Sequence, residues 1–432
     1  MQRDTSPSQP GPSQPGPSQF GAAPSDGVDA LWTGCIRPNG RPRRWIIAAL
    51  ALAAAVHIGK AHGAPAAPVA QVAPPQPPAA YPLPAGAVWV DNGAELARAL
   101  LPEQPQDIVL KDGRYGASGP FNNACGHRLF AQHQGKAILT SGLNIGSNDC
   151  AGGARVQGLA FDVQEPGNAA NNAAIEVWGT ARNMVVADIA IDGHGVLDSG
   201  IAARQPEGLI LQRVTAANFR SWGIFVDADD FKRTVAEPPL LEDLDVANVS
   251  RPVPQSADGT AEACIWVGNT AVGRRFKVRN CAWMGVWTGT AAKNTHLSDI
   301  DIDDIGPPRG ISTGLYLEHF TTDSLFERLH IGPNVGVGVV CEWADPAWGK
   351  QPACDGVVIQ DSVIDSRCVG AYLDDGTRNT TLRRTAFVHQ EKAAVAVFNN
   401  NYNILYDTAG NDYTQMRASA RTVLNQNNPC EE

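Results

Sequence analysis

Three carboxylates occupy the same place in three short apolar segments of the C-terminal half. Glu318 follows GLYL, Glu342 follows GVVC and Asp374 follows GAYL, so each is the fifth residue of its segment. Carboxyl groups held close together repel each other, which raises the pKa of one and leaves a proton donor beside an ionised base. Such a pair can hydrolyse a glycosidic bond. We therefore predict that these three residues are catalytic.

The separation of these carboxylates bears on the reaction. If the segments are neighbouring strands, Glu318 and Glu342 lie about 5 Å apart, and Glu318 and Asp374 about 10 Å, before the side chains bend. Separations of about 5–5.5 Å suit a retaining glycosidase, and about 6.5–9.5 Å an inverting one. The alternatives are a solvated acidic face and a calcium site, because Ca²⁺ takes several carboxylate oxygens. The sequence assigns no metal ligand, and Ca²⁺ is the one cofactor it leaves open.

Aromatic side chains recur at the third position of the same kind of segment. In CIWVGNT and GVWTGTA, a glycine follows the tryptophan by two residues. A sugar ring can lie flat on an aromatic face, and a glycine beside it leaves open space. The alternative is a structural stack covered by the insertion at 229–262. The predicted substrate-binding aromatics are Phe225, Trp266, Trp287, Tyr316 and Tyr372.

Five further residues complete the predicted substrate surface. Arg204 and Asp227 hold the fifth position in earlier segments, and His319 and Asp375 adjoin the carboxylates in sequence. Trp343 follows Glu342 and opens the loop CEWADPAWGKQPAC, which could form a wall of the groove.

These segments belong to a repeat that extends over much of the chain. Between equivalent apolar residues from Ile175 to Val395, the residue numbers rise by 26, 23, 41, 21, 29, 24, 32 and 24. The second and fourth positions of each segment are almost wholly apolar, so they face an interior, and the third and fifth positions face outward. A unit of about two dozen residues with two or three short strands suits one coil of a parallel β-helix.

On these residues the sequence resembles the right-handed parallel β-helix proteins of the pectate-lyase-like superfamily. The resemblance covers most of residues 88–415, and AELARALLPEQPQDIVLKDGRYGASGPF resembles their N-terminal capping helix and first strand. It implies an all-β solenoid whose first strand set lines a substrate groove. The fold alone does not define a reaction, because it carries lyases, hydrolases, epimerases and adhesins. The catalytic motifs of polygalacturonase-like hydrolases are not present in their order.

Two other functions remain open beside hydrolysis. A lyase acting on a uronic-acid polymer needs a base and a cation that neutralises the substrate carboxylate. Its candidates, Arg204, Arg220, Arg309 and Arg367, are scattered along the predicted axis. The other alternative is a surface protein that binds glycans through the same aromatics without cleaving them. In each case the predicted partner is a polysaccharide or oligosaccharide.

Charge and the N-terminal composition indicate where the protein acts. The formal net charge of -10 argues against a nucleic-acid partner. Residues 1–42 are predicted to be a disordered leader, 43–64 an export signal or anchor, and 65–86 a Pro/Ala linker. The β-helix should then span 87–415, followed by a tail at 416–432. We expect an exported protein, periplasmic, secreted or at the cell surface, and Arg43-Arg44 suggests the twin-arginine route. Only the N-terminal segment could contact a membrane.

Eight of the nine cysteines follow the predicted export segment. An even number in an exported chain predicts disulfides, and Cys125–Cys150 is the first pair we name. Cys341–Cys354 is disfavoured because Cys341 falls at an inward position. The other cysteines could be small buried apolar side chains.

Overall fold

A computed structural model describes residues 82–432 except for 125, 147–152, 179–182, 205, 228–236, 251–262, 269, 291, 307–311, 343–351, 375, 399–405, 409, 417–423, 426–429 and 431–432. The predicted leader, the export segment and nearly all of the linker lie outside the described residues. So do Trp343, Asp375 and the Cys125–Cys150 pair. Among the described residues, no helix is long and apolar enough to cross a membrane.

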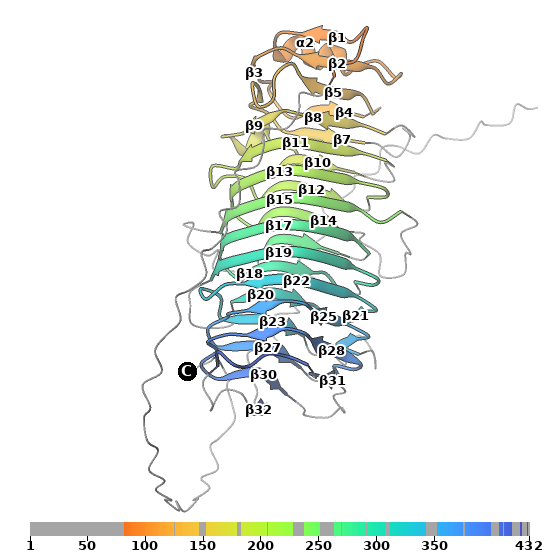
Figure 1. Cartoon of the computed structure of the whole chain (residues 1–432). Helices are drawn as coiled ribbons and strands as arrows, with labels where there is room; N and C mark the ends of the chain where they lie inside the picture. The colour runs from red at the N-terminus through yellow and green to blue at the C-terminus, as the bar shows by residue number, and fades with distance from the viewer. Residues whose placement is uncertain are drawn as a thin grey trace, which may run out of the picture. The chain divides into compact units, whose positions relative to one another are not determined.

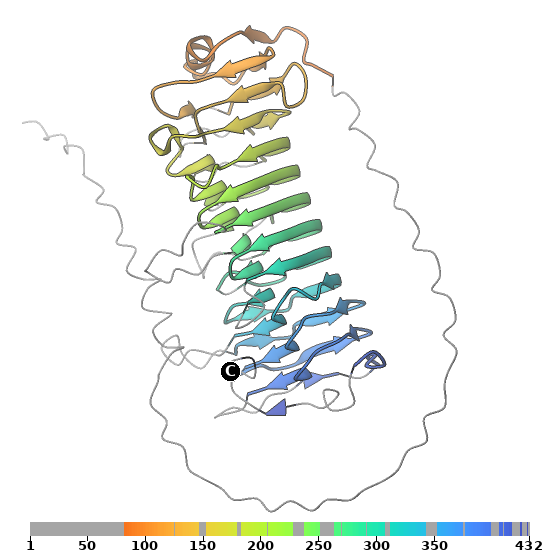
Figure 2. The same ribbon diagram turned by 90° about the vertical axis from the view of Figure 1, so that its left-hand side faces the viewer.

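Two long parallel sheets form the body of the structure, and their strands alternate along the chain (Figure 1). Figure 2 shows the strands stacked as successive coils from the N-terminal end to the C-terminal end. All the strand pairs are parallel, so each coil hydrogen-bonds to the coil before it and the coil after it. This confirms the parallel β-helix that the repeat predicts.

We call the 12-stranded sheet the site sheet. Its strands are β4 (Phe121–Asn123), β7 (Leu143–Ile145), β10 (Ala173–Val177), β12 (Ser199–Arg204), β14 (Trp222–Asp227), β16 (Ala263–Val267), β18 (Met284–Thr288), β20 (Thr313–Leu317), β23 (Val337–Cys341), β27 (Val369–Leu373), β30 (Ala393–Val397) and β32 (Leu424–Asn425).

The 18-stranded sheet forms a second wall. Its strands are β1 (Val88–Val90), β2 (Asp107–Leu110), β3 (Gly113–Tyr115), β5 (Arg128–Ala131), β6 (Ala137–Leu139), β8 (Arg155–Gln157), β9 (Ala160–Asp162), β11 (Val185–Asp192), β13 (Ile210–Phe219), β15 (Leu240–Val249), β17 (Val272–Cys281), β19 (His296–Ile305), β22 (Leu325–Ile331), β25 (Val358–Gln360), β26 (Val363–Ile364), β28 (Thr380–Arg383), β29 (Ala386–Phe387) and β31 (Tyr406–Asp407).

Three shorter elements complete the described fold. The short helix α2 (Gly93–Ala99) lies at the N-terminal end of the stack, and Asn92 caps it by accepting from the Glu95 backbone N–H (Figure 1). A 3-10 turn, η1, covers Pro166–Asn168, and β21 (Thr321–Thr322) pairs with β24 (Cys354–Asp355) beside the site sheet.

The register of the site sheet aligns equivalent positions of successive segments. The second-position residues pair directly from Ile175 to Val395, and all of them are buried. The third-position column runs Glu176, Ala202, Phe225, Trp266, Trp287, Tyr316, Val340, Tyr372 and Ala396. The inward and outward columns deduced from the repeat are therefore confirmed.

The 18-stranded sheet carries a column of charged residues that alternate in sign, which we call the charge ladder. Its members all have positive φ, between 51° and 60°. They occur within the long strands, and between the shorter pairs β25–β26 and β28–β29 they mark the point where the strand is interrupted. The ladder consists of Asp188, Arg213, Asp243, Arg275, Asp299, Arg328, Asp361 and Arg384.

Because the sign of the charge alternates along the charge ladder, its neighbouring members form ion pairs. Arg275 donates to Asp243 through Nε at 2.6 Å and Nη2 at 2.9 Å. Arg328 makes the same bidentate contact with Asp299, at 2.7 and 3.0 Å. Arg213–Asp188 and Arg384–Asp361 repeat this geometry. Two-pronged guanidinium–carboxylate contacts are stronger than single ones. They offset part of the backbone strain of a non-glycine residue at positive φ.

Three disulfides join cysteines of the described chain: Cys264–Cys281, Cys341–Cys354 and Cys368–Cys430. The expectation against Cys341–Cys354 was wrong. Both cysteines are fully buried, so Cys354 meets Cys341 in the interior, and the inward position does not prevent the disulfide. Cys264 also faces the interior: its neighbours in adjacent coils are Gly223 and Gly285, where an added Cβ would meet core side chains at 2.1 and 2.7 Å. These disulfides are consistent with export to an oxidising compartment.

Replacing Arg275 by Gln should expose the contribution of the charge ladder. Arg275 holds the pKa of Asp243 below its usual range, chiefly by hydrogen bonding. The stabilisation is therefore present above the ordinary aspartate pKa and is lost as the pH falls through the lowered folded-state value. Because both side chains are partly exposed, we expect a loss of at most about 1 kcal/mol at neutral pH. Denaturant unfolding at neutral and at acidic pH measures it.

Arg279→Gln provides a matched control on the same strand, because Arg279 contacts Asp245 through one bond of 2.9 Å outside the ladder. We expect it to destabilise the protein less than R275Q does. If R275Q lost the same unfolding free energy at a pH where Asp243 is protonated, the ion pair would not be the cause of the loss.

Candidate functional site

Glu318 and Glu342 leave the ends of adjacent strands of the site sheet, β20 and β23. The Glu318 backbone N–H donates to the Thr288 carbonyl at 3.3 Å, and that of Glu342 donates to the Leu317 carbonyl at 2.9 Å. The coil-to-coil ladder thus continues through both residues. Parallel register therefore carries the two side chains to the same edge, as the fifth-position column predicts.

A tight turn fixes Glu318 and His319. Phe320 has φ +69, a conformation that bulky residues rarely adopt. The Thr321 hydroxyl donates to the Glu318 carbonyl at 2.8 Å, which closes the turn into β21. Strand β24 pairs with β21, and the Cys341–Cys354 disulfide joins β24 to the strand that precedes Glu342. The positions of the two carboxylates are thus fixed by β20 and β23 and by the two-stranded sheet of β21 and β24.

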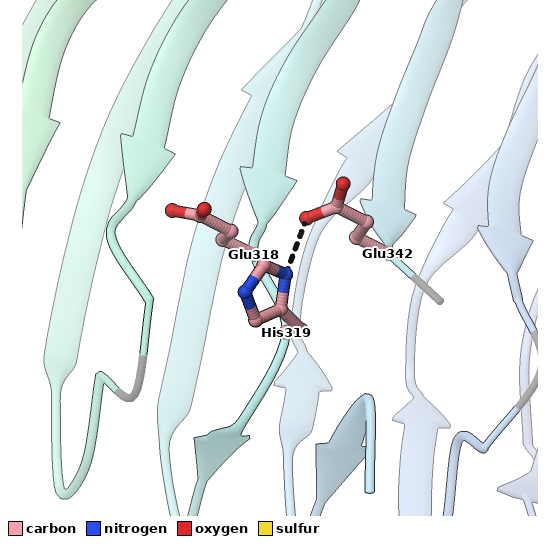
Figure 3. Close-up of side chains that lie close together, drawn as sticks. All are labelled: Glu318, His319 and Glu342. Atoms are coloured by element: carbon pink, nitrogen blue, oxygen red, sulfur yellow. Dashed lines mark hydrogen bonds and ion pairs between the residues drawn. The ribbon is translucent and has the colours of Figure 1, made fainter. Parts of the chain in front are cut away.

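Glu318, His319 and Glu342 form one cluster, shown side by side in Figure 3. One functional atom of each lies within 4.8 Å of those of the other two. His319 Nδ1 lies 3.1 Å from Glu342 Oε2, and Trp287 Nε1 donates to Glu318 Oε2 at 3.1 Å. Glu318 and His319 are only 6% and 3% exposed, whereas Glu342 is half-buried. The more accessible carboxylate is therefore Glu342.

Burial, and after it the negative charge of Glu342, raise the pKa of Glu318 to about 7. The positive field of His319 and hydrogen bonds from Thr290 and Trp287 oppose this shift without cancelling it. A carboxyl group with such a pKa is still protonated in a large fraction of the molecules at neutral pH, beside a second carboxylate. That is the arrangement of a proton donor and a base or nucleophile.

The same cluster could supply three ligands to a cation. Two carboxylates with an imidazole suit Zn²⁺ or Mn²⁺ better than Ca²⁺, which binds six to eight oxygens. Within the described residues, the cluster does not extend to Asp374, one coil beyond Glu342. The oxygen-rich cage that calcium requires is thus not assembled by these three residues.

An aromatic cluster adjoins the carboxylates on the outer face of the site sheet. Trp266 and Trp287 have ring centroids 4.2 Å apart, and Tyr316 meets Trp287 edge-on at 5.4 Å. Phe225 stacks on Trp266 at 5.6 Å. Trp222, which the sequence analysis did not single out, lies 5.2 Å from Trp266 and 5.7 Å from Trp287. Its position at the start of β14, outside the aligned third-position column, concealed it.

The aromatic residues are not an open floor with empty glycine sites, which corrects the sequence-based interpretation. Trp287 is only 5% exposed because neighbouring rings surround it and Glu318 accepts its N–H. A Cβ on Gly289 would lie 2.7 Å from the Trp266 ring, and one on Gly268 would lie 2.0 Å from the Asp227 carboxylate. Each glycine therefore makes room for a side chain of the preceding coil.

Gly289→Ala tests this packing. The new methyl group would collide with the Trp266 ring, and overpacking of this kind costs about 1–3 kcal/mol. We expect a loss of that size in unfolding free energy, together with a change in tryptophan fluorescence. Gly119→Ala is the control, because a Cβ there meets nothing within 4 Å. Equal unfolding free energies of the two variants would show that the Trp266 ring does not need a glycine at position 289.

The remaining predicted substrate residues lie along the site sheet away from the pair. Arg204 and Asp227 are paired in register on β12 and β14. Tyr372 packs against a small apolar cluster of Val337, Val369 and Ala396, so its ring is partly covered. Glu318, Glu342, His319, Trp287 and Tyr316 are therefore the predicted residues that the fold gathers at one place.

Comparisons with known proteins show the fold. No family model matches the chain, and no curated protein matches it in sequence. The catalytic domain of a GH87 α-1,3-glucanase variant solved with tetrasaccharides is similar over 78% of this chain and 70% of its own, at 12% identity and TM-score 0.51. An alginate lyase from Paenibacillus sp. str. FPU-7 is similar over 78% of this chain and 97% of its own, at 11% identity and TM-score 0.38.

A surface adhesin of Streptococcus pneumoniae, PfbA, is also similar in structure, over 77% of this chain and 86% of its own, at 8% identity and TM-score 0.45. At these identities the likeness is one of fold alone. The function must be argued from the site.

Proposed function

We propose that this protein is an exported glycoside hydrolase that cleaves a polysaccharide through Glu318 and Glu342. The observation that carries the proposal is the close approach of the two groups, with functional atoms within 4.8 Å, Glu318 being 6% exposed and the Glu342 side chain 17%. Hydrolysis with two carboxyl groups needs one protonated and one ionised. Their different environments provide that difference.

Each group has a distinct task in this mechanism. Glu318 donates its proton to the glycosidic oxygen as the bond to the anomeric carbon breaks. Glu342, oriented by His319 Nδ1 at 3.1 Å, attacks the anomeric carbon and forms a glycosyl–enzyme ester. Water then attacks the same carbon, Glu318 takes the proton from that water, and Glu342 leaves as a carboxylate. Separations near 5–5.5 Å are typical of retaining enzymes, so we propose retention.

The charges near the pair favour hydrolysis over elimination from a uronate. A lyase needs a cation to neutralise the substrate carboxylate. Of the arginines considered for that role, Arg220 contacts Asp198, Arg367 contacts Glu391 and Arg204 contacts Glu176, at 3.8, 3.4 and 3.7 Å. Each is thus already engaged with a carboxylate other than Glu318 or Glu342. The ionised Glu342 carboxylate would repel an acidic sugar.

Glu318→Gln and Glu342→Gln test the reaction. The full chain is incubated with neutral polymers of glucose, xylose, mannose and galactose and with polygalacturonate, and reducing ends and ultraviolet absorbance are recorded together. The glucans include α-1,3-glucan because of the similarity of fold. We expect reducing ends without absorbance in the wild type, and a rate at least about 100-fold lower in either variant. NMR of the first product should show the anomeric configuration retained.

Three outcomes would contradict this proposal. Absorbance from an unsaturated uronate would indicate a lyase. Wild-type binding without new reducing ends would indicate a glycan-binding protein. Activity that is abolished by a chelator and restored by Zn²⁺ or Mn²⁺ would show that the cluster acts through a metal; we expect a chelator to leave the rate unchanged.

The raised pKa of Glu318 predicts that the activity and stability of the wild type depend on pH, and that E318Q loses this contribution to the pH dependence of stability. Activity of the wild type should fall as the pH rises through about 7, because the proton donor is lost. The folded state also holds this proton more tightly than the unfolded chain, so stability is lost as the pH rises towards the folded pKa. Gln cannot ionise. E318Q should therefore gain roughly 1–3 kcal/mol relative to wild type between acidic and alkaline pH.

Denaturant unfolding across that pH range measures the gain. Glu342→Gln is the informative comparison, because it removes the repulsion that contributes to the raised pKa of Glu318. It should make the pH dependence of stability shallower without abolishing it. If E318Q kept the same pH dependence as the wild type, another group would be responsible.

A further inference from the structure

A second cluster of unusual side chains lies on the site sheet, towards the N-terminal end from the carboxylate pair. It is formed by Glu176 at the third position of β10, Trp178 just after β10, and Arg204 at the end of β12. Four strand spacings separate β12 from β20, which bears Glu318 at its end. At about 4.8 Å per spacing, the two places are about 20 Å apart along the axis.

Glu176 is a carboxylate buried on the outward-facing column. Its side chain is only 1% exposed, and Oε1 accepts from Asn171 Nδ2 at 3.0 Å. The other oxygen, Oε2, is buried and makes no hydrogen bond to the described residues. Arg204 Nε, 3.7 Å from Oε1, is also buried and has no hydrogen-bond partner there. Unsatisfied buried polar atoms are rare in folded proteins, so two in one ion pair call for an explanation.

Arg204 lies between aromatic rings. Its guanidinium carbon is 5.9 Å from the centre of the Trp178 ring and 5.6 Å from that of Phe225. Contacts at these distances hold a guanidinium by cation–π attraction. Because 38% of the side chain is exposed although Nε is buried, the exposure belongs to the rest of the side chain. Glu176 and the two rings thus position a partly exposed hydrogen-bond donor.

Trp178 offers more open aromatic surface than the central tryptophans, which are buried or of intermediate exposure. It is 42% exposed, against 5% for Trp287. Among the exposed large apolar side chains of the described residues, Trp178 is the one that adjoins a strand of the site sheet. An indole face beside a guanidinium suits a sugar ring, which offers C–H groups to the indole and hydroxyl oxygens to the guanidinium N–H groups.

We propose that Trp178, Arg204 and Glu176 form a distal subsite that binds one neutral sugar residue of the glycan. The sugar stacks on Trp178, and its hydroxyls accept from Arg204. Glu176 is too buried to touch the sugar, so its part is to position the Arg204 guanidinium. A neutral sugar is favoured over an acidic one because Glu176 already neutralises Arg204 and Asp227 pairs in register beside it.

This proposal rests on the proposed glycan substrate and adds a requirement for chain length. A disaccharide at the carboxylate pair cannot reach a subsite about 20 Å away. A long oligosaccharide can occupy both. Loss of the subsite should therefore weaken binding of long chains and leave short ones unaffected.

The test uses Trp178→Ala and Arg204→Gln in the full chain, each also combined with Glu318→Gln so that the ligand is not cleaved. Affinity electrophoresis and calorimetry measure binding of the same neutral polymers, of their oligosaccharides from disaccharide to octasaccharide, and of galacturonate oligosaccharides. We expect W178A and R204Q to weaken binding of long neutral chains about 10-fold, which is about 1.4 kcal/mol. Trp89→Ala is the matched control, because Trp89 is 46% exposed and lies on β1, outside the site sheet.

The outcomes separate this subsite from the proposed reaction. If the wild type cleaves none of the polymers but binding still depends on Trp178, hydrolysis is refuted and the subsite stands. If the wild type cleaves a polymer and W178A binds and cleaves every length equally well, the subsite is refuted. It is also refuted if galacturonate chains bind more tightly than neutral ones, or if W89A weakens binding as much as W178A. A failure to bind any of these glycans overturns it as well.

Discussion

The hydrogen bonds between parallel coils are the interaction on which the rest of this structure depends. They hold equivalent residues of successive segments in register, about 4.8 Å apart. Side chains at one position therefore stack on their own kind. For apolar residues at the second and fourth positions this is favourable, because each stacked pair removes surface from water. For charged residues the same register brings like charges together unless the sequence prevents it.

The charge ladder and the carboxylate pair are two responses to this constraint. In the ladder the sign alternates from coil to coil, so every charge meets an opposite one in a two-pronged contact. Directly after β20 and β23 the sign does not alternate, and the charge of Glu342 adds to the effect of burial in raising the pKa of Glu318. The protein thus neutralises charge on one wall and retains an unfavourable pair on the other. Retained repulsion of this kind is characteristic of functional sites.

On the outer face of the site sheet, the same register stacks aromatic side chains on one another. Register places Phe225, Trp266, Trp287 and Tyr316 in one column, and the rings on either side of Trp287 cover it. Trp287 thereby becomes a support for Glu318, through its N–H, and loses the surface a sugar would need. Trp178 keeps an open face because it follows its strand at the fifth position, where its neighbours in register are not aromatic. Position in the column thus decides which aromatic side chains stay exposed.

The sequence by itself determined the coil, its inward and outward columns and the row of carboxylates, because a period of two within a repeated segment depends only on the order of residues. It also contained the charge ladder, as alternating Asp and Arg at one place in the second strand type, although the signal became clear only in register. The tertiary structure decided which outward residues are open, which glycines are filled and which cysteines meet. Those outcomes depend on side-chain rotamers and on contacts between coils and connecting turns. A pattern of residue types within one segment cannot encode them.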